Sequence, residues 1–342
     1  MKPDTLVRVQ ENTDIASARR TAAQFAQKAG LGEEDLGALA IVVTEAAGNL
    51  IKHGRGGDLI LRNVSGDSHP LIEIIAIDSG AGMANIARCF EDGYSTAGSP
   101  GTGLGALARL SKFHDLYSAP DKGTVLLAHV GARTANHADT VVEIGAINVP
   151  YPGEEVSGDA WAFDVSPRRI RLIVADGLGH GIFAAEASAA AIEFVNDDRS
   201  PDPLAVVQDA HARLRSTRGG AIAVVDLDVD SRSLTFAGVG NVAGSIISPA
   251  QVRRQMVSIN GTLGQEVRNP RQYQYPAEPG ALVILHSDGL STHWSLDKYP
   301  GLFQRHPSVI AGVLFRDFRR TRDDATVVVA RIGSGHIGSK EP

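Results

Sequence analysis

Glu45, Asn49 and His53 follow one another at intervals of four residues in the segment VVTEAAGNLIKHG, residues 42–54. On a helix this spacing places the three polar side chains along one line, because four residues make slightly more than one turn. The surrounding segment, residues 33–53, carries apolar residues at helical spacing, so another face of this predicted helix meets a core. A helix with one core face and one mixed polar face suits the wall of a ligand cavity. It equally suits an amphipathic helix whose polar side meets water.

An acidic residue also ends the segment LIEIIAID, which is predicted to form a strand at residues 71–77. The strand is apolar on both faces and is therefore predicted to be central in its sheet. Asp78 follows it, and Gly80 and Gly82 come next, where the chain turns. Glycines at such a turn let the backbone approach a flat ligand closely.

A glycine-rich loop at residues 98–105 leads into another predicted helix. Free backbone amides and the positive end of a helix dipole make such a loop suitable for binding phosphate. Taken alone the pattern is weak, because a glycine loop before a helix is often only a turn.

In the second half of the chain, carboxylates stand at the ends of hydrophobic segments. They lie in SGD, VADGLGHG, SDGL and RDDAT, and they are Asp159, Asp176, Asp288 and the pair Asp323 and Asp324. A single aspartate at a strand end is commonly a turn residue or a helix cap. If several such ends converge, the like charges need compensation, and a pair of hard divalent cations would supply it.

These segments need two folded domains to position them. The chain has 342 residues, of which 43% are hydrophobic, and this length favours two domains that each bury a core. The polar segment GARTANHADT, residues 131–140, separates two strand-like segments and marks the boundary. We therefore predict domains at 1–135 and 136–335, followed by a tail at 336–342.

Composition excludes several partners. Lys and Arg total 33 against 39 Asp and Glu, a net charge of −6, which argues against a nucleic-acid partner bound through its phosphates. The single cysteine, Cys89, cannot form an internal disulfide, and the N-terminus lacks the apolar core of a signal peptide. No apolar run is long enough to span a membrane. The chain is expected to be cytoplasmic, with no membrane partner, and a homodimer is compatible with the sequence.

Three motifs in the first half together resemble those of the GHKL ATPase superfamily, and the match spans most of residues 1–130. Glu45, Asn49 and His53 match the N box, and Asp78, Gly80 and Gly82 match the first glycine box. The second glycine box is matched by Gly101, Thr102, Gly103, Leu104 and Gly105. Within the superfamily, the text DGYSTAGSPGTGLGALARL looks most like the bacterial anti-sigma or RsbT-type serine kinases.

This resemblance implies ATP and Mg2+ as cofactors and a protein serine or threonine as substrate. It implies that Asn49 holds Mg2+ against the nucleotide phosphates and that Asp78 accepts the adenine amino group. Glu45 would be the base that takes the proton from the substrate hydroxyl, and Thr96 would touch phosphate or be a plain loop residue. The implied ATP-binding set is Asn49, Asp78, Gly80, Gly82, Thr96, Gly101, Thr102, Gly103, Leu104 and Gly105.

The acidic motifs of the second half resemble the metal-dependent type 2C serine/threonine phosphatases, specifically their SpoIIE and RsbX branch, over about residues 141–333. The resemblance implies two Mn2+ or Mg2+ ions that activate a water for attack on a phosphoserine. The implied metal ligands are the carboxylates of Asp159, Asp176, Asp288 and Asp323 and the carbonyl of Gly177. Asp323 is preferred to Asp324 because the family ligand is the first residue of that pair.

The predicted fold class is α+β: an N-terminal Bergerat-type α/β sandwich followed by a C-terminal αββα phosphatase sandwich. The predicted function is a bifunctional regulator that phosphorylates and dephosphorylates a STAS-domain protein, of the anti-sigma antagonist or stressosome kind, in a bacterial sigma-factor or stress-signalling switch. One alternative is an ATP-sensing or anti-sigma binding module attached to an active phosphoserine phosphatase. Another is a phosphatase that has lost activity and works as a scaffold.

Overall fold

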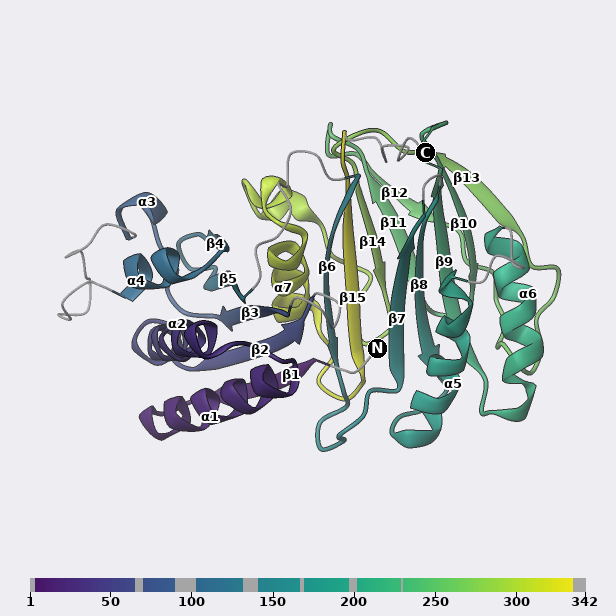
Figure 1. The fold of residues 1–342 in the computed structure, drawn as a ribbon. Coiled ribbons are helices and arrows are strands. Elements are labelled where there is room, and N and C mark those ends of the chain that lie inside the picture. The colour runs from purple at the N-terminus through teal and green to yellow at the C-terminus, as the bar shows by residue number, and fades with distance from the viewer. Residues whose placement is uncertain are drawn as a thin grey trace, which may run out of the picture. The chain divides into compact units, whose positions relative to one another are not determined.

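The computed structural model describes residues 4–64, 70–89, 103–131, 141–166, 169–196, 202–228 and 230–334. The chain folds into two compact units (Figure 1). The N-terminal unit consists of Asp4–Ala135 together with Gln304–Arg316, and the C-terminal unit consists of Met1–Pro3, Asn136–Phe303 and Asp317–Pro342. The predicted domain limits at 135 and 335 stay predictions, because the segments 132–140 and 335–342 lie outside the described residues.

The N-terminal unit is built on an antiparallel five-stranded sheet in the order β1-β2-β3-β5-β4. Its strands are β1 (Thr5–Val9), β2 (Gly57–Asn63), β3 (Leu71–Asp78), β4 (Phe113–Ser118) and β5 (Thr124–Gly131). Its helices are α1 (Asn12–Lys28), α2 (Glu33–Lys52), α3 (Ile86–Cys89), α4 (Gly103–Leu110) and α7 (Pro307–Phe318) up to Arg316. Strand β3 is central and buried at every position, which confirms the prediction from its two-sided apolar pattern.

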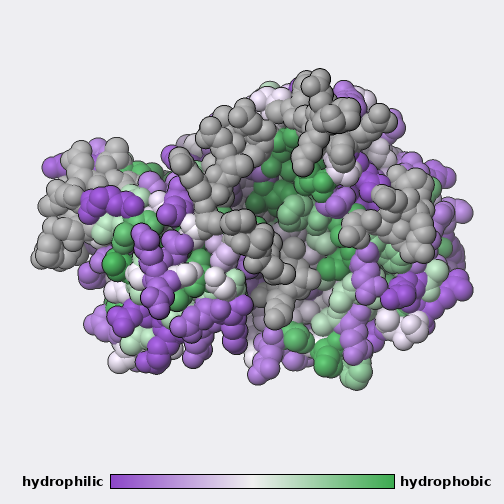
Figure 2. Space-filling view, viewed as in Figure 1, coloured by the Kyte–Doolittle hydropathy of each residue, from purple (hydrophilic) through white to green (hydrophobic). Residues whose placement is uncertain are grey.

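Helices pack on both faces of this sheet. On one face α1 and α2 share a core with alternate residues of the strands (Figure 1), and Figure 2 shows mainly hydrophilic residues on the outer side of α1. On the other face, Gly312 of α7 approaches β5 so closely that an added Cβ would lie 2.6 Å from Cγ1 of Val125. Residues Pro307–Phe315 of α7 are all buried. The N-terminal unit thus includes a helix from far along the chain, which the sequence did not predict.

Helix α2 shows the two faces that its sequence predicts. Its buried residues are Leu39, Val42, Val43, Ala46, Ala47, Gly48 and Leu50. Acidic residues occupy its first turn, where the positive end of the helix dipole stabilises them. Glu45 and Asn49 on the other face are only partly buried, so their side chains border the core without being enclosed by it.

The C-terminal unit contains two antiparallel five-stranded sheets in the orders β13-β10-β9-β8-β7 and β12-β11-β14-β15-β6. The first sheet comprises β7 (Asp159–Val165), β8 (Arg169–Gly177), β9 (Gly220–Asp228), β10 (Ser233–Val239) and β13 (Gln272–Pro276). The second comprises β6 (Val142–Val149), β11 (Ala243–Ile247), β12 (Arg253–Met256), β14 (Leu282–His286) and β15 (Ala325–Ile332). Short 3-10 helices lie at Glu193–Asn196, Leu214–Ser216, Leu296–Lys298 and Leu302–Gln304.

Apolar residues from the facing sides of the two sheets form one core, which includes Trp161, Phe236 and Val328. Helices α5 (Ile182–Ile192) and α6 (Pro203–Arg213) cover the outer face of the first sheet (Figure 1) and form a second core with it. This layered arrangement in both units confirms the predicted α+β class. Among the described residues, no helix is long and apolar enough to cross a membrane.

Candidate functional site

Asp78 lies at the end of β3 in the N-terminal unit, where it is 8% exposed. Its Oδ1 accepts hydrogen bonds from the backbone nitrogens of Gly80, at 2.8 Å, and Thr124, at 3.2 Å. Burial raises the pKa of this carboxyl, and the two backbone donors partly offset that shift. The amides fix Asp78 through one oxygen, so the other is oriented and available to accept from a ligand.

The glycines after Asp78 hold its loop tightly against the protein backbone. A Cβ on Gly80 would lie 2.1 Å from the backbone oxygen of His53, and one on Gly82 would lie 1.9 Å from that of Ala119. Gly82 also has a φ of 68°, which disfavours residues with a side chain. Both glycines therefore position the Asp78 loop through packing, whereas the sequence suggested only a close approach to a ligand.

Glu45 points towards the beginning of helix α4. A Cβ built on Gly103, the first residue of α4, would lie 2.6 Å from Oε2 of Glu45. Asn49 lies one turn further along α2, and its backbone oxygen accepts from the nitrogen of His53 at 3.0 Å. The structure thus brings Glu45 next to Gly103. Leu104 packs against the core and Gly105 is buried, whereas Thr96, Gly101 and Thr102 lie outside the described residues.

Two polar residues that the sequence analysis missed support this site. The Ser118 hydroxyl donates to the backbone oxygen of Gly123 at 2.9 Å and lies 3.1 Å from Oγ1 of Thr124. It also accepts from the backbone nitrogen of Met83 at 2.9 Å. Ser118 and Thr124 are 7% and 9% exposed. The text DKG before β5 marks a turn, but nothing in the sequence places that turn beside Asp78.

In the C-terminal unit, strand register brings two of the predicted carboxylates together. Asp159 on β7 lies directly opposite Asp176 on β8. Burial, with repulsion from Asp324 and Asp288, raises the pKa of Asp159 to about 7, although the Ser287 hydroxyl counteracts it. Burial and the neighbouring carboxylates, Asp159 first among them, raise the pKa of Asp176 to about 9. Asp159 and Asp176 therefore lie in one strongly acidic cluster.

The remaining carboxylates come from the second sheet. Asp288 follows β14, and its Oδ2 accepts a hydrogen bond of 2.6 Å from the side-chain amide of Asn241. Burial and the adjacent Asp288 raise the pKa of Asp323 to about 6. Asp324 is anchored differently, because its Oδ1 accepts from the backbone nitrogen of Tyr151 at 2.8 Å. Asp323 is thus the member of the pair that faces Asp288 most closely.

The polar atoms of this cluster fit a divalent cation. Oδ2 of Asp159 and Oδ2 of Asp324 are buried and have no hydrogen-bond partner among the described residues. Such oxygens are costly to bury unless a cation or a donor compensates them. In the described part of the chain, no group of three or more His, Cys, Asp or Glu side chains lies close enough together to hold a metal ion as it stands. Like-charged carboxylates repel one another until a cation binds, which accounts for their separation here.

Gly177 and two histidines complete the surroundings. A Cβ on Gly177 would lie 2.0 Å from the backbone oxygen of Ala184, so only glycine fits beneath α5. His286 accepts from the Trp294 indole nitrogen at 3.2 Å, and its Nδ1 lies 2.8 Å from the Ser287 carbonyl. Burial lowers the pKa of His286 to about 4, so this histidine is neutral and both its nitrogens are used by the protein.

His180 is more exposed and lies on the loop that follows Gly177. Its Nδ1 is 2.9 Å from Oε1 of Glu154, and its ring stacks on Tyr151 with centroids 4.4 Å apart. These contacts fix the position of His180 in the loop that follows Gly177.

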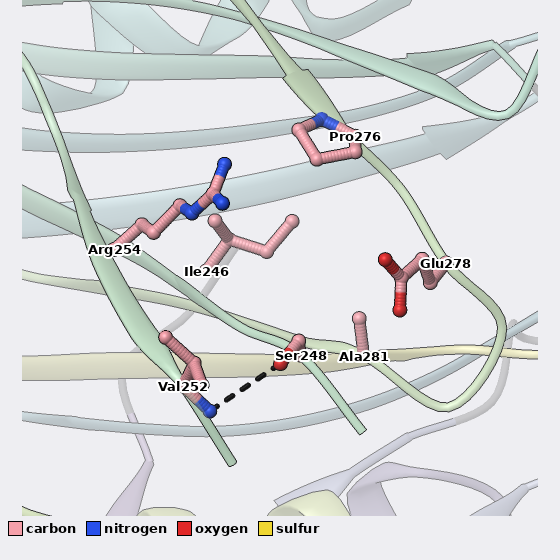
Figure 3. A pocket seen from close by; sticks show the side chains of 7 residues that line it. All are labelled: Ile246, Ser248, Val252, Arg254, Pro276, Glu278 and Ala281. Atoms are coloured by element: carbon pink, nitrogen blue, oxygen red, sulfur yellow. Dashed lines mark hydrogen bonds between the residues drawn. The ribbon is translucent and has the colours of Figure 1, made fainter. Parts of the chain in front are cut away.

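A separate pocket lies on β11, β12 and β13 of the C-terminal unit (Figure 3). It is lined by Ile246, Ser248, Val252, Arg254, Pro276, Glu278 and Ala281, and it includes the hydrogen bond from the Val252 nitrogen to the Ser248 hydroxyl. None of the predicted site residues lines it.

The two halves of the chain match two different families. Residues 9–129 match the family described as histidine kinase-like ATPase domain, and residues 166–333 match the family described as stage II sporulation protein E, SpoIIE. The serine/threonine-protein kinase RsbT of Bacillus subtilis (strain 168) is 30% identical over 128 residues, which cover 37% of this chain and 96% of RsbT. The phosphoserine phosphatase RsbX of the same strain is 27% identical over 139 residues, which cover 41% of this chain and 70% of RsbX.

A solved structure also matches, under the description of the bacterial stressosome as a modular system adapted to control secondary messenger signalling. It has a TM-score of 0.51 and 27% identity, and the match covers 56% of this chain and 99% of that chain. The N-terminal half of the chain therefore belongs to the histidine kinase-like ATPases, and the C-terminal half is similar to the SpoIIE family. The similarity of one half to RsbT and of the other half to RsbX confirms the predicted fusion.

Proposed function

We propose that this chain is a bifunctional regulator that phosphorylates and dephosphorylates serine or threonine on one STAS-domain protein in a bacterial sigma-factor or stress-signalling switch. The observation that carries the proposal is the acidic cluster around Asp159 and Asp176, in which the buried Oδ2 of Asp159 has no hydrogen-bond partner among the described residues. It is supported by the separate similarity of the two halves to a protein kinase and to a phosphoserine phosphatase. The STAS-domain substrate comes from the resemblance to anti-sigma and stressosome regulators.

For the phosphatase, two Mn2+ or Mg2+ ions would be held by Asp159, Asp176, Asp288 and Asp323 and by the Gly177 carbonyl. When bound, the ions would supply positive charge and lower the pKa of a water that attacks the phosphoserine. The chain itself fixes the carboxylates. The β7–β8 register holds Asp159 opposite Asp176, and Asn241 orients Asp288 by donating to its Oδ2.

For the kinase, ATP would bind with its adenine amino group on the carboxylate oxygen of Asp78 that the backbone amides leave available. Asn49 would hold Mg2+ beside the phosphates, and the loop before α4 would bind them. Glu45 would accept the proton of the substrate hydroxyl as that oxygen bonds to the γ-phosphorus and ADP leaves.

A second candidate function keeps the phosphatase and makes the N-terminal unit a binding module only. The contact of Glu45 with Gly103 favours it, because a carboxylate beside the first residue of α4 also stabilises the positive end of that helix. In this case ATP binding would report nucleotide level without phosphoryl transfer.

The test uses the purified full chain with a phosphorylated STAS protein and with p-nitrophenyl phosphate. Metal-dependent hydrolysis is expected, with loss of turnover in Asp288→Asn and after EDTA treatment. Asp230→Asn is the matched control, because Asp230 is an exposed carboxylate in the β9–β10 turn. Full activity in EDTA or in Asp288→Asn would overturn the phosphatase proposal.

Kinase activity is tested with radiolabelled ATP and the unphosphorylated STAS protein, followed by mapping of the modified residue. Label on a serine or threonine is expected for the wild type and absent for Asn49→Ala. ATP binding without transfer would establish the second candidate instead.

A further inference from the structure

Three large apolar residues lie exposed immediately after the predicted metal residues Asp176 and Gly177. The relative exposure of Leu178, Ile182 and Phe183 is 51%, 61% and 55%. Figure 2 shows hydrophobic side chains on the surface near the lower end of α5, the end at which this helix begins. Clustered apolar side chains that stay in water commonly mark an interaction site.

An arginine stands beside these residues. The Arg218 guanidinium lies over the Phe183 ring, with Cζ 4.9 Å from the ring centroid. Its Nη1 would be 3.3 Å from a Cβ added to Gly179, so it reaches the loop that begins at Gly177. Arg218 itself is exposed.

Backbone contacts fix Arg218 at this position. The nitrogen of Leu178 donates to the oxygen of Gly219 at 2.9 Å, and Gly220 pairs with Gly177 in the β8–β9 ladder. The Gln265 side chain donates to the backbone oxygen of Arg218 at 3.0 Å. In the described part of the chain, no carboxylate forms an ion pair with its guanidinium. Within the described residues, Arg218 is therefore a cation without a carboxylate partner, and it lies beside the loop that follows Asp176 and Gly177.

We propose that Leu178, Ile182, Phe183 and Arg218 form a docking surface for the phosphoserine segment of the substrate protein. The proposal rests on the proposed phosphatase function. Arg218 binds the phosphate, because a guanidinium pairs with phosphate oxygens through two parallel hydrogen bonds. The apolar residues contact an apolar side chain next to the phosphoserine.

The charge of Arg218 and the position of the docking surface favour a phosphoserine segment as its ligand. Arg218 is a fixed cation beside the loop that follows Gly177, so it attracts a phosphate dianion and directs the approach of the substrate. The apolar residues continue from the same loop that carries Gly177, so a bound segment reaches the reacting site without crossing other elements.

The test measures binding by fluorescence anisotropy on the full chain in Mn2+. The probes are two peptides that carry the non-hydrolysable phosphonate analogue of phosphoserine, flanked by leucines in one and by serines in the other. For the wild type, we expect the leucine peptide to bind about tenfold more tightly than the serine peptide, as one well-placed apolar contact provides. Phe183→Ala should abolish this preference, and Val252→Ala, at an exposed apolar residue of the separate pocket, should keep it.

Arg218→Ala should weaken binding of the leucine phosphonate peptide about tenfold and change binding of the same peptide without phosphonate by less than twofold. Arg218→Lys should restore part of the loss, whereas Arg254→Ala should cause none. Equal affinities of the wild type, Phe183→Ala and Arg218→Ala for the phosphonate peptides would overturn the proposal. The proposal would also be overturned if light scattering showed that the wild type is a dimer, and if Phe183→Ala made it monomeric without changing its affinity for the peptides.

Hydrolysis of p-nitrophenyl phosphate by the wild-type protein tests the phosphatase function separately from the docking surface. Metal-dependent turnover with no peptide preference overturns the docking surface alone. Absence of that turnover overturns the proposed phosphatase function on which the docking surface rests.

Discussion

Arg316 of helix α7 donates a hydrogen bond of 3.3 Å to the backbone oxygen of Asp78, at the end of β3. The residue proposed to recognise adenine is therefore held by a side chain that lies 238 positions later in the chain. Arg316 also lowers the pKa of Asp78, which burial raises. A positive charge beside Asp78 thus favours the ionised form that accepts a hydrogen bond from a ligand.

We expect Arg316→Ala to weaken ATP binding several-fold, because both the backbone position and the ionisation of Asp78 depend on it. Isothermal titration of the full chain with ATP and Mg2+ measures the effect. Arg20→Ala, at an exposed position on α1, is the control and should bind like the wild type. Unchanged affinity in Arg316→Ala would show that the contact has no role in nucleotide binding.

Glu45→Gln separates the kinase from the binding module. If Glu45 is the base, the variant should keep its ATP affinity and lose phosphoryl transfer by roughly 10² to 10⁴-fold, the usual effect of removing a general base. The assay is single-turnover transfer of labelled phosphate to the STAS protein. Glu34→Gln, in the exposed first turn of α2, is the matched control. A near-normal rate in Glu45→Gln would exclude the base.

Much of this architecture could be predicted from local patterns. The two-sided apolar pattern of residues 71–77 correctly predicted a central strand, and the spacing of polar residues correctly predicted the mixed face of α2. The Asp-Gly junctions predicted acidic residues at strand ends, and Asp159 and Asp176 lie opposite each other across two paired strands. Such features depend on residues that are close in sequence, so the local sequence pattern is enough to predict them.

The rest depended on contacts between distant segments. The text PSVIAGVLF cannot indicate that α7 packs on the sheet of the N-terminal unit. Nothing in the sequence indicates that Asn241 lies beside Asp288, or that the Ser118 hydroxyl accepts from the Met83 backbone nitrogen.

Glu73 makes the stability of the N-terminal unit depend on pH. Burial alone would raise its pKa, but the Arg62 guanidinium and the rings of His129 and His306 outweigh it and lower the pKa from 4.5 to about 2. The Ser308 hydroxyl also donates to its Oε2 at 2.7 Å. A carboxyl whose pKa is lower in the folded state than in the unfolded state stabilises the fold when the pH is above the unfolded pKa. For Glu73 this stabilisation is lost as the pH falls from 4.5 towards about 2.

We therefore expect Glu73→Gln to destabilise the N-terminal unit at neutral pH by roughly 3–5 kcal/mol, because Arg62 remains buried without its carboxylate. The difference from the wild type should shrink as the pH falls through that interval. Hydrogen exchange of β2 and β3 peptides, measured by mass spectrometry, reports this unit separately from the other. A constant difference at all pH values would contradict the assignment, and Glu34→Gln should show no difference.

Asn241 should tune the phosphatase by orienting Asp288. Asn241→Ala removes the 2.6 Å hydrogen bond, and loss of a group that supports a metal ligand costs roughly 10 to 100-fold in metal affinity or activity. Asn241→Asp keeps the shape but replaces the donor by an acceptor beside Asp288, so it should not restore the orientation of Asp288. Metal-titrated hydrolysis of p-nitrophenyl phosphate checks both. Wild-type metal dependence in both variants would show that Asp288 needs no such support.

Asp176 should destabilise the metal-free C-terminal unit as the pH rises. Its pKa is about 9 in the fold against 3.8 ordinarily, because of burial and the surrounding carboxylates. The folded state therefore keeps a proton that the unfolded chain releases, so stability present at low pH is lost as the pH rises towards 9. In EDTA at mildly alkaline pH, Asp176→Asn should melt a few degrees above the wild type, since the amide is neutral and carries no repulsion.

Adding Mn2+ should reverse this order, because bound cations compensate the wild-type carboxylates and displace the proton. The wild type should then melt above Asp176→Asn, which should also lack hydrolytic activity. Differential scanning calorimetry of both proteins, in EDTA and in Mn2+, at mildly acidic and mildly alkaline pH, resolves the transition of this unit. Asp230→Asn should follow the wild type throughout. A lower melting temperature for Asp176→Asn than for the wild type in alkaline EDTA would show that the carboxylates of the cluster do not repel one another strongly. If Mn2+ did not raise the melting temperature of the wild type, the proposed metal site would be wrong.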